Sequence, residues 1–561
     1  MTLYRWLRKM PCSGRKFVRV TKFLLAGVAV FCVSWIACVQ EWHGGVEWRA
    51  RREASALPTM RTIVGYSEGK RAELDRPSPF NCIRLPAFPF VPHINRTWSP
   101  GVVPKSSWQH VPGTKVSLYA AYYDERLPQR YIRILASFEG RLLTSKEPLY
   151  CQTRQENPFD NSVEVVAAKH LEIWNPQWDL ESLTVETPLL LSCPLTEPLS
   201  FPSIVSVVTE PCDDPTNAFS IQPSQHKQFK RNFTICVKDM NFNKDISQNI
   251  IEWIEINKLL GVEMIDMYID NIRKESENVL LHYRNKGNIR LFHVPINDKP
   301  KRSLWQRRRD HIITYNDCLY RNIGESEYVI PLDVDEVILP KIAHTLFELI
   351  QRLKSINNWS SSEGSAITVQ NVFFFDFMQG PHKYKHKKVP RNKSKMYVKR
   401  DDVRILNTNA SYIGEIELVD SGSFSNEVIE YSDDRKFYEE YKVRCGKELV
   451  EPKLARHVVS SALISPVGYY GKSMMVTRNV LTAFNHYPLA SLRESLWSYG
   501  WAAPFFEVQL NHYKESCDTT VVKEDCARYG RRARLDRSAL RLRRQLTRAL
   551  ASAVCTPINI T

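Results

Sequence analysis

From about residue 232 to residue 375 the sequence alternates regularly between short apolar runs and amphipathic stretches with helical spacing. The apolar runs have the length and composition of strands, and they cover residues 233–237, 264–269, 289–293, 328–332 and 366–375. The amphipathic stretches between them predict helices over residues 245–260, 276–283, 305–321 and 343–353. Strands that alternate with helices of this length form a mainly parallel sheet with helices on both faces, so the sequence predicts an α/β fold here.

Two acidic segments fall where predicted strands end. Asp270 closes the run 264–269, and the cluster Asp333-Val334-Asp335-Glu336 follows the run 328–332. In open parallel sheets, ligands bind beyond the carboxyl ends of the strands. The sequence therefore predicts a ligand site at this edge of the sheet.

The region before the alternation has a different pattern. Short strand-like runs at residues 115–123, 131–136 and 163–166 predict a small β-rich domain. Residues 40–110 mix charges with several prolines and show little periodicity, so we interpret them as a stem.

The N-terminus carries an uncharged apolar run, Phe23 to Val39, and seven basic residues precede it. A helix of this length nearly spans the roughly 30 Å hydrocarbon core of a bilayer, and the preceding positive charges favour the cytoplasmic side. The segment therefore predicts a type II membrane anchor with the rest of the chain in the lumen. A cleaved signal peptide is the alternative, but the charged region is long and no small-x-small cleavage site follows.

These patterns together predict the domain order of the chain. The segments are a cytoplasmic tail over 1–22, an anchor over 23–39, a stem over 40–110, a β-rich domain over 111–215, an α/β domain over 230–515 and a basic tail over 516–561.

Sequons and cysteines agree with a lumenal placement. Glycosylation sequons of the N-x-Ser/Thr type occur at Asn95, Asn232, Asn358, Asn392, Asn409 and Asn559. Ten of the 13 cysteines follow the anchor, and they are dispersed without a C-x-x-C pair, which disfavours a zinc site. An oxidising lumen predicts some disulfides, although sequence alone does not give their pairing.

The formal net charge of +16 favours anionic partners, but it does not choose among nucleic acid, phosphorylated ligands and an acidic membrane face. Much of this charge lies in residues 528–554, where nine arginines alternate with leucines in a pattern typical of a basic amphipathic helix. Such a helix either packs on the domain with a solvated face or contacts an anionic ligand or membrane. A nucleic-acid partner is excluded by the predicted lumenal placement of the tail.

The acidic cluster indicates a chemistry. Asp333 and Asp335, two residues apart where a strand opens into a turn, can both reach one hard divalent cation such as Mn²⁺ or Mg²⁺. A cation held in this way neutralises a diphosphate and stabilises it as a leaving group. The alternative interpretation is an exposed acidic turn. Either His486 or His512 could complete the metal shell, although an isolated histidine is more often a packing residue.

The segment Tyr328 to Pro340 (YVIPLDVDEVILP) resembles the core motif of glycosyltransferase family 92. Similar stretches follow the family's order at residues 117–126, 267–271, 315–321, 472–475 and 511–514. The resemblance implies a GT-A fold, a UDP-galactose donor, a divalent metal (Mn²⁺ or Mg²⁺), inversion at the anomeric carbon and a glycan acceptor on glycoproteins. Together with the type II anchor, it predicts an enzyme of the Golgi membrane. It assigns metal binding to Asp333 and Asp335, makes His512 the better histidine ligand and places His486 second.

Other site residues are open to two interpretations. Asp270 and Asn271 could contact uracil or ribose, or Asp270 could cap the helix that comes next. The helix before the acidic strand could line the donor pocket or simply present a polar face through its residues Gln306, Arg309, Asn316 and Asp317. Cys318 on that helix indicates a disulfide rather than a catalytic thiol.

An inverting transfer also needs a carboxylate base on the face opposite the leaving group. The candidates, which the sequence does not separate, are Glu415, Glu417, Asp420 and Glu507. Two other classes of function compete with the transferase. A catalytically inactive lumenal glycan-binding protein would keep the fold without metal-dependent turnover, and a hydrolase would need two carboxylates several ångströms apart across a cleft.

Overall fold

The computed structural model divides the chain into two units, Met1–Ser67 and Glu68–Thr561, and all the residues that it describes lie in the second unit. The described residues are 80, 82, 94–95, 108–140, 148–155, 163–175, 178, 185–196, 201–223, 229–294, 302–357, 359–360, 364–379, 385–386, 417–418, 452–493, 500–516 and 528–555. The predicted cytoplasmic tail and the predicted anchor lie outside them. Among the helices of these described ranges, none has the length and apolar character needed to cross a membrane.

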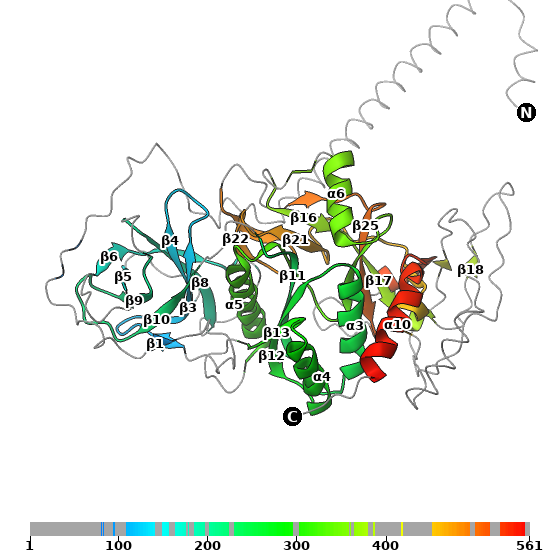
Figure 1. The fold of residues 1–561 in the computed structure, drawn as a ribbon, viewed down its shortest axis with the longest axis horizontal. Helices are drawn as coiled ribbons and strands as arrows, with labels where there is room; N and C mark the ends of the chain where they lie inside the picture. Colours follow the sequence, from blue (N-terminus) through cyan, green and yellow to red (C-terminus); the bar gives the residue numbers. More distant parts are fainter. Residues whose placement is uncertain are drawn as a thin grey trace, which may run out of the picture. The chain divides into compact units, whose positions relative to one another are not determined.

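The first part of the second unit is a ten-stranded sheet, drawn in blue and cyan in Figure 1. Its strands follow the order β6-β5-β9-β10-β3-β4-β8-β7, with β1 beside β10 and β2 beside β3. They are β1 (Ile94–Asn95), β2 (Gln109–His110), β3 (Val116–Asp124), β4 (Tyr131–Glu139), β5 (Tyr150–Arg154), β6 (Glu164–Ala167), β7 (Lys169–Glu172), β8 (Glu186–Pro194), β9 (Ile204–Val208) and β10 (Ala218–Gln222). The predicted β-rich character of this region is confirmed.

Disulfides hold this first sheet. Cys151 of β5 pairs with Cys193 of β8, and Cys82 pairs with Cys212. Cys151 and Cys193 are both fully buried in the hydrophobic core of this sheet. Their disulfide joins β5 and β8, which are not neighbours in the strand order. The expectation of disulfides is thus confirmed for these residues.

The next part is a seven-stranded sheet in the order β13-β12-β11-β14-β21-β16-β24. Its strands are β11 (Arg231–Asn241), β12 (Met264–Asn271), β13 (Ile289–His293), β14 (Ser326–Pro331), β16 (Ala366–Val369), β21 (Lys472–Val476) and β24 (Trp501–Ala502). The four strands from β13 to β14 are parallel, and β21 is antiparallel to both of its neighbours.

Helices connect the parallel strands, as the alternating pattern predicts. They are α3 (Ser247–Leu259), α4 (Lys274–Asn285) and α5 (Leu304–Asn322), followed beyond β14 by α6 (Leu346–Asn357). Gly261 follows the C-cap of α3 and has a φ of 92°, a left-handed conformation that favours glycine. The sequence correctly predicts that the helix ends before this residue. The chain is therefore a mixed α/β protein in which sheets predominate.

The run 366–375, predicted as one strand, is two strands in different sheets. After β16, the strand β17 (Asn371–Phe375) leaves the seven-stranded sheet and joins a three-stranded sheet in the order β15-β25-β17. Its partners there are β15 (Glu336–Pro340) and β25 (Val508–Lys514). The prediction was wrong because it joined two fully buried strands across the polar pair Gln370-Asn371, which lies where the chain changes sheets.

The remaining elements are short, apart from the last helix. They are η3 (Asp376–Gln379), α8 (Lys453–Arg456), η5 (Leu540–Leu542), α10 (Arg543–Cys555), the hairpin β22 (Val480–Ala483) and β23 (Pro488–Ser491), and a four-stranded sheet of β18 (Lys385–His386), β19 (Glu417–Leu418), β26 (Arg532–Leu535) and β20 (Val459–Ser461).

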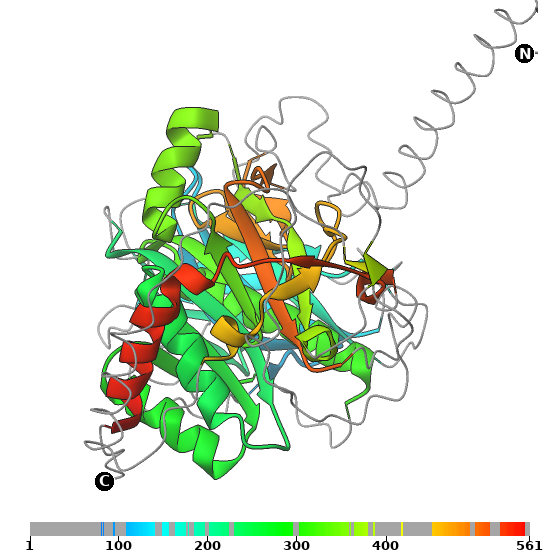
Figure 2. The same ribbon diagram turned by 90° about the vertical axis from the view of Figure 1, so that its right-hand side faces the viewer.

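The basic segment 528–554 does not form one continuous helix. Its first half contains β26, which pairs antiparallel with β20, so a sheet partner distant in sequence overrides the local helical pattern. The second half is α10, which lies beside α3 (Figure 1, Figure 2). Leu546 and Leu550 of α10 belong to the same hydrophobic core as Ile250 and Ile254 of α3. The structure therefore supports the interpretation that this helix packs on the domain.

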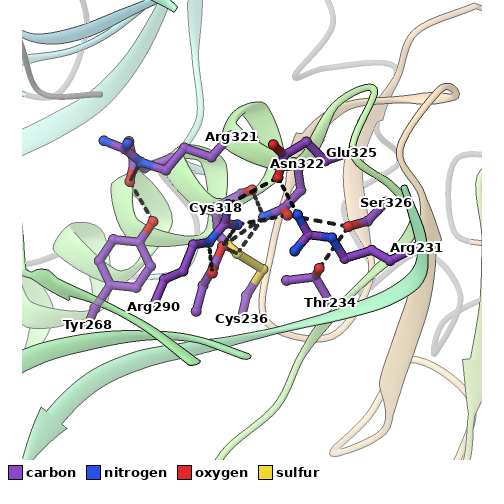
Figure 3. A network of polar contacts seen from close by, with 12 residues as sticks. Arg231, Thr234, Cys236, Tyr268, Arg290, Cys318, Arg321, Asn322, Glu325 and Ser326 are labelled. Carbon is purple, nitrogen blue, oxygen red and sulfur yellow. Dashed lines mark hydrogen bonds and ion pairs between the residues drawn. A yellow bond between two sulfur atoms is a disulfide. The ribbon is translucent and has the colours of Figure 1, made fainter. Parts of the chain in front are cut away.

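A buried polar network fastens α5 to the strands beside it (Figure 3). The Cys236–Cys318 disulfide joins β11 to α5, which confirms the structural role predicted for Cys318. Asp266 of β12 is fully buried and accepts two hydrogen bonds of 2.6 Å from the Arg290 guanidinium, while Glu325 pairs with both Arg290 and Arg231. These contacts fix β11, β12 and β13 against the helix that leads into β14.

We expect Leu546→Ala to lower the free energy of unfolding by about 2–4 kcal/mol, because it opens a cavity in the core shared by α10 and α3. The control is Gln545→Ala, whose side chain is exposed on the same helix and should change stability by less than about 0.5 kcal/mol. Denaturant unfolding of both variants measures the difference. Equal stabilities would show that α10 is not part of the core.

Candidate functional site

The site lies where the order of the parallel strands reverses. From β11 the chain continues to β12 on one side, whereas β14 lies on the other side of β11. In sheets of this kind, the crevice beyond the carboxyl ends of two such strands is the usual ligand position. A cavity of about 450 Å³ opens there, lined by the end of β11 (Val237 to Met240), the turn after β14 (Asp333 to Asp335) and the end of β25 (His512 to Lys514).

The turn after β14 presents three carboxylates. Its backbone is closed by the Glu336 N–H, which donates to the Asp333 carbonyl at 3.0 Å, while the Glu336 carboxylate accepts from the Asp333 N–H at 2.9 Å. The Asp335 side chain is 44% exposed, the Asp333 side chain 24% and the Glu336 side chain 2%. Asp333 and Asp335 therefore face the cavity, while Glu336 points into the protein.

Two lysines neutralise part of this negative charge. The side chain of Lys472, the first residue of β21, is fully buried, and its Nζ lies 3.3 Å from Asp333 Oδ2 and 3.1 Å from Glu336 Oε2. Lys238 of β11 places its Nζ 3.0 Å from Asp333 Oδ1. Burial opposes ionisation of Asp333, but the ammonium groups of Lys238 and Lys472 outweigh it and hold the pKa of Asp333 well below its ordinary value.

Glu336 and Lys472 respond to burial in opposite ways. Burial raises the pKa of Glu336 despite the nearby Lys472 ammonium. For Lys472, burial alone would lower the pKa, but the carboxylates of Asp333 and Glu336 raise it above the ordinary value. The ammonium therefore stays charged inside the protein.

His512 reaches the acidic turn through the pairing of β25 with β15. In this antiparallel pair, His512 stands opposite Glu336. Its Nε2 lies 3.3 Å from Asp335 Oδ2 and its Nδ1 lies 3.4 Å from Glu336 Oε1. The Tyr513 N–H also donates to the Asp335 carbonyl at 2.8 Å, so β25 fixes both the histidine and the turn that it faces.

The donor atoms at this turn suit one divalent cation with an incomplete protein shell. Asp335 Oδ2 and His512 Nε2 are close enough to bond the same ion, and Asp335 is half exposed to the cavity. Asp333 is instead engaged by the two lysines. Within the described residues, no group of three or more His, Cys, Asp and Glu side chains is arranged for a metal, so water or ligand oxygens would have to complete the shell.

His486, the second histidine proposed as a ligand, has other partners. Its Nδ1 lies 2.7 Å from the Gly471 carbonyl oxygen and its Nε2 lies 3.3 Å from the Asn485 side-chain nitrogen. Burial lowers the pKa of His486 to about 3, so the ring is neutral. Both nitrogens are thus occupied by protein groups, and the structure brings together Asp335 and His512 rather than Asp335 and His486.

Asp270 and Asn271 lie at the end of β12 and do not line this cavity. Asp270 accepts a hydrogen bond of 2.6 Å from Asn241 and forms an ion pair with Arg302. Helix α4 begins at Lys274, and its N-cap residue is Arg273 rather than Asp270. The alternative that Asp270 caps this helix is therefore wrong. Asn271 is exposed and donates to Asn243 at 3.2 Å.

The four residues proposed on α5 face the neighbouring sheets. Gln306 and Arg309 line a separate small cavity of about 20 Å³ against β8, where the Gln306 side chain accepts from the Glu186 N–H at 2.8 Å. The Asn316 side chain is fully buried and exchanges two hydrogen bonds with the backbone of Ala483 in β22. Asp317 is fully buried, accepts from Tyr122 of β3 and Tyr268 of β12, and pairs with Arg321 at 2.7 Å. The polar face of α5 therefore joins elements of the fold.

Among the base candidates, Glu507 is buried and holds Arg352 through both carboxylate oxygens, at 2.9 and 3.0 Å. It does not line the cavity at the acidic turn. Glu415 and Asp420 lie outside the described residues, and Glu417 lies in β19. Glu415, Glu417 and Asp420 stay predictions.

Three charged residues of the site were not identified as such from the sequence. Lys238 and Asp239 end the apolar core of β11, and Lys472 opens one of the stretches that resemble the family. The buried Asp239 side chain lies 2.7 Å from Arg307 and 2.8 Å from His311; burial opposes its ionisation, but these partners lower the pKa of Asp239 to about 2. The sequence signal that could have identified Lys238 and Asp239 is their position at the end of an apolar strand.

The parallel strands and the cavity beyond their carboxyl ends define an open α/β protein, a class in which ligands usually bind at this position. A family model described as glycosyltransferase family 92 matches residues 231–542, from the first residue of β11 to the end of η5. The match covers more than half of the chain, and the chain belongs to glycosyltransferase family 92. The resemblance found in the sequence is thus confirmed.

The chain is also similar to a Caenorhabditis elegans protein named beta-1,4-galactosyltransferase galt-1. The two are 25% identical over 251 residues, which cover 42% of this chain and 54% of the relative. The chain thus spans about half the length of that relative.

We expect Lys472→Met to destabilise the protein by about 3–5 kcal/mol, because it leaves the Asp333 and Glu336 carboxylates without a buried counter-charge. The double variant Lys472→Met/Glu336→Gln should recover part of this loss, since it also removes one of the two negative charges. Denaturant unfolding measures both. The electrostatic account is contradicted if the single variant is as stable as the wild type, or if the double variant shows the full additive loss.

Proposed function

We propose that this glycosyltransferase transfers galactose from UDP-galactose, with inversion, to a glycan acceptor on glycoproteins. The main support is the acidic turn after β14, which faces the cavity together with His512 and Lys238 and is held from inside the protein by the buried Lys472. The name of the C. elegans relative supports galactose as the sugar. The proposed fold of the catalytic part is GT-A, for which the parallel order β13-β12-β11-β14 with an antiparallel β21 beside it is the support.

The charges around the cavity favour a metal-assisted donor site. At the acidic turn, three carboxylates face two lysines, so a diphosphate that approached this turn would meet an excess of negative charge. Asp335 and His512 would hold a Mn²⁺ or Mg²⁺ ion, which supplies positive charge to the departing diphosphate. The chain's own residues prepare this arrangement: Lys472 orients Asp333, and the pairing of β25 with β15 holds His512 against Asp335.

For the acceptor proton, Glu415, Glu417 and Asp420 are the proposed base candidates. The fourth candidate, Glu507, has a weaker case because Arg352 engages both of its carboxylate oxygens. A free carboxylate oxygen directed at the acceptor hydroxyl is what general-base catalysis requires.

The proposed location is the Golgi membrane, with a single N-terminal helix and the catalytic part in the lumen. The uncharged run Phe23 to Val39 and the basic residues before it support the anchor. The disulfides found among the described residues support an oxidising compartment.

The full-length protein should release UDP from UDP-galactose in the presence of Mn²⁺, and a chelator should abolish the release. We expect Asp335→Asn and His512→Gln each to lower the rate by about 10²–10³-fold, because each removes a group that holds positive charge at the leaving diphosphate. Glu277→Gln, an exposed carboxylate on α4, is the control and should keep the wild-type rate.

Two results would overturn parts of this proposal. Equal release by wild type and Asp335→Asn would remove the acidic turn from the mechanism. Release from no UDP-sugar in a donor panel would favour the alternative of a catalytically inactive glycan-binding protein.

A further inference from the structure

Lys238 occupies an unusual position for a lysine that only stabilises the fold. It lies near the carboxyl end of β11, and its Nζ is 3.0 Å from Asp333 Oδ1 and 3.1 Å from Asp333 Oδ2, so one ammonium group engages both oxygens of the carboxylate. Its side chain is 22% exposed and lines the cavity of about 450 Å³. The ammonium can therefore leave Asp333 without disturbing the core.

Lys472 contacts the same carboxylate from the interior of the protein. Its side chain is fully buried, and its Nζ is held by Glu336 at 3.1 Å and by the Asn485 side chain as well as by Asp333. Lys472 does not line the cavity. Asp333 would thus keep a fixed counter-ion if Lys238 moved away.

Lys238 is well placed to bind an anionic ligand, because Asp333 already has a counter-ion in Lys472. A phosphate oxygen is a strong acceptor for an ammonium group, and a pyrophosphate brings at least two negative charges into a cavity that already holds Asp333 and Asp335. Lys244 at the same cavity offers less, because it is 57% exposed and pairs with the equally exposed Glu515.

We propose that Lys238 is a diphosphate-binding residue that exchanges partners during the reaction cycle. In the free enzyme it neutralises Asp333, and when the donor binds, its ammonium group passes to a phosphate oxygen while Lys472 keeps Asp333 charged and oriented. No bond is made or broken in this exchange. The inference rests on the proposed function, because it assumes that the ligand is a nucleoside diphosphate.

The exchange has a consequence that a purely structural lysine would not produce. Removing the Lys238 ammonium should weaken binding of UDP, because one charge-assisted hydrogen bond to phosphate is lost. The same change should strengthen binding of Mn²⁺ in the absence of nucleotide, because both Asp333 oxygens lose a competing cation. The two affinities are expected to change in opposite directions.

The test uses the full-length protein with Lys238→Met and, as a control, Lys230→Met. Lys230 lies just before the amino end of the same strand, is 49% exposed and pairs with Glu325. Its substitution removes the same charge at the other end of the strand, away from the cavity. UDP binding is measured by calorimetry, uridine binding by NMR titration, and Mn²⁺ binding by EPR of the free ion. A melting curve of each variant checks folding, and Lys238→Arg tests whether charge alone restores the UDP affinity.

We expect Lys238→Met to bind UDP at least tenfold more weakly and Mn²⁺ severalfold more tightly, with uridine binding unchanged. Lys230→Met should match the wild type, and Lys238→Arg should regain most of the UDP affinity. Wild-type UDP affinity in Lys238→Met overturns this inference and leaves the proposed function intact. Unchanged or weaker Mn²⁺ binding overturns the partner exchange, and a wild type that does not bind UDP overturns both the donor class and the inference.

Discussion

The acidic turn after β14 and the strands around it depend on one buried ammonium group, that of Lys472. A charged group without solvent is costly unless it is paired, and here the Asp333 and Glu336 carboxylates and the Asn485 side chain surround it. These contacts connect β21, the turn after β14 and the tip of the β22–β23 hairpin. Because the carboxylates and the ammonium each need the other, the acidic turn has little freedom to adopt a second arrangement.

The rest of the site is assembled around this fixed turn by segments distant in sequence. The strand reversal between β11 and β14 opens the cavity and brings Lys238 to Asp333. The pairing of β25 with β15 places His512 opposite Glu336 and within 3.3 Å of Asp335. The result is an exposed acidic group for a ligand or cation beside a buried one that holds the geometry, in a chain that belongs to glycosyltransferase family 92.

Local periodicity was enough to predict the strands and helices from β11 to β14, whereas features that depend on long-range pairing were missed. The exposed Asp335 also belongs to a local pattern, and His512 was favoured by a stretch resembling the family. The pairing of Asp333 with Lys472 was not predictable, because it depends on β21 pairing antiparallel with β14 from far along the chain. For the same reason, the polar face of α5 could not be assigned: Asn316 binds the backbone of β22, a contact that only the folded chain makes.

The most direct test of this account is pulsed EPR of the full-length protein with Mn²⁺ and UDP, measuring the coupling between the ion and histidine nitrogen. The account predicts a histidine coupling in the wild type that disappears in His512→Gln and persists in His486→Gln, because only His512 faces Asp335. A coupling that survives in His512→Gln, or that is lost in His486→Gln, would contradict the assignment of the site.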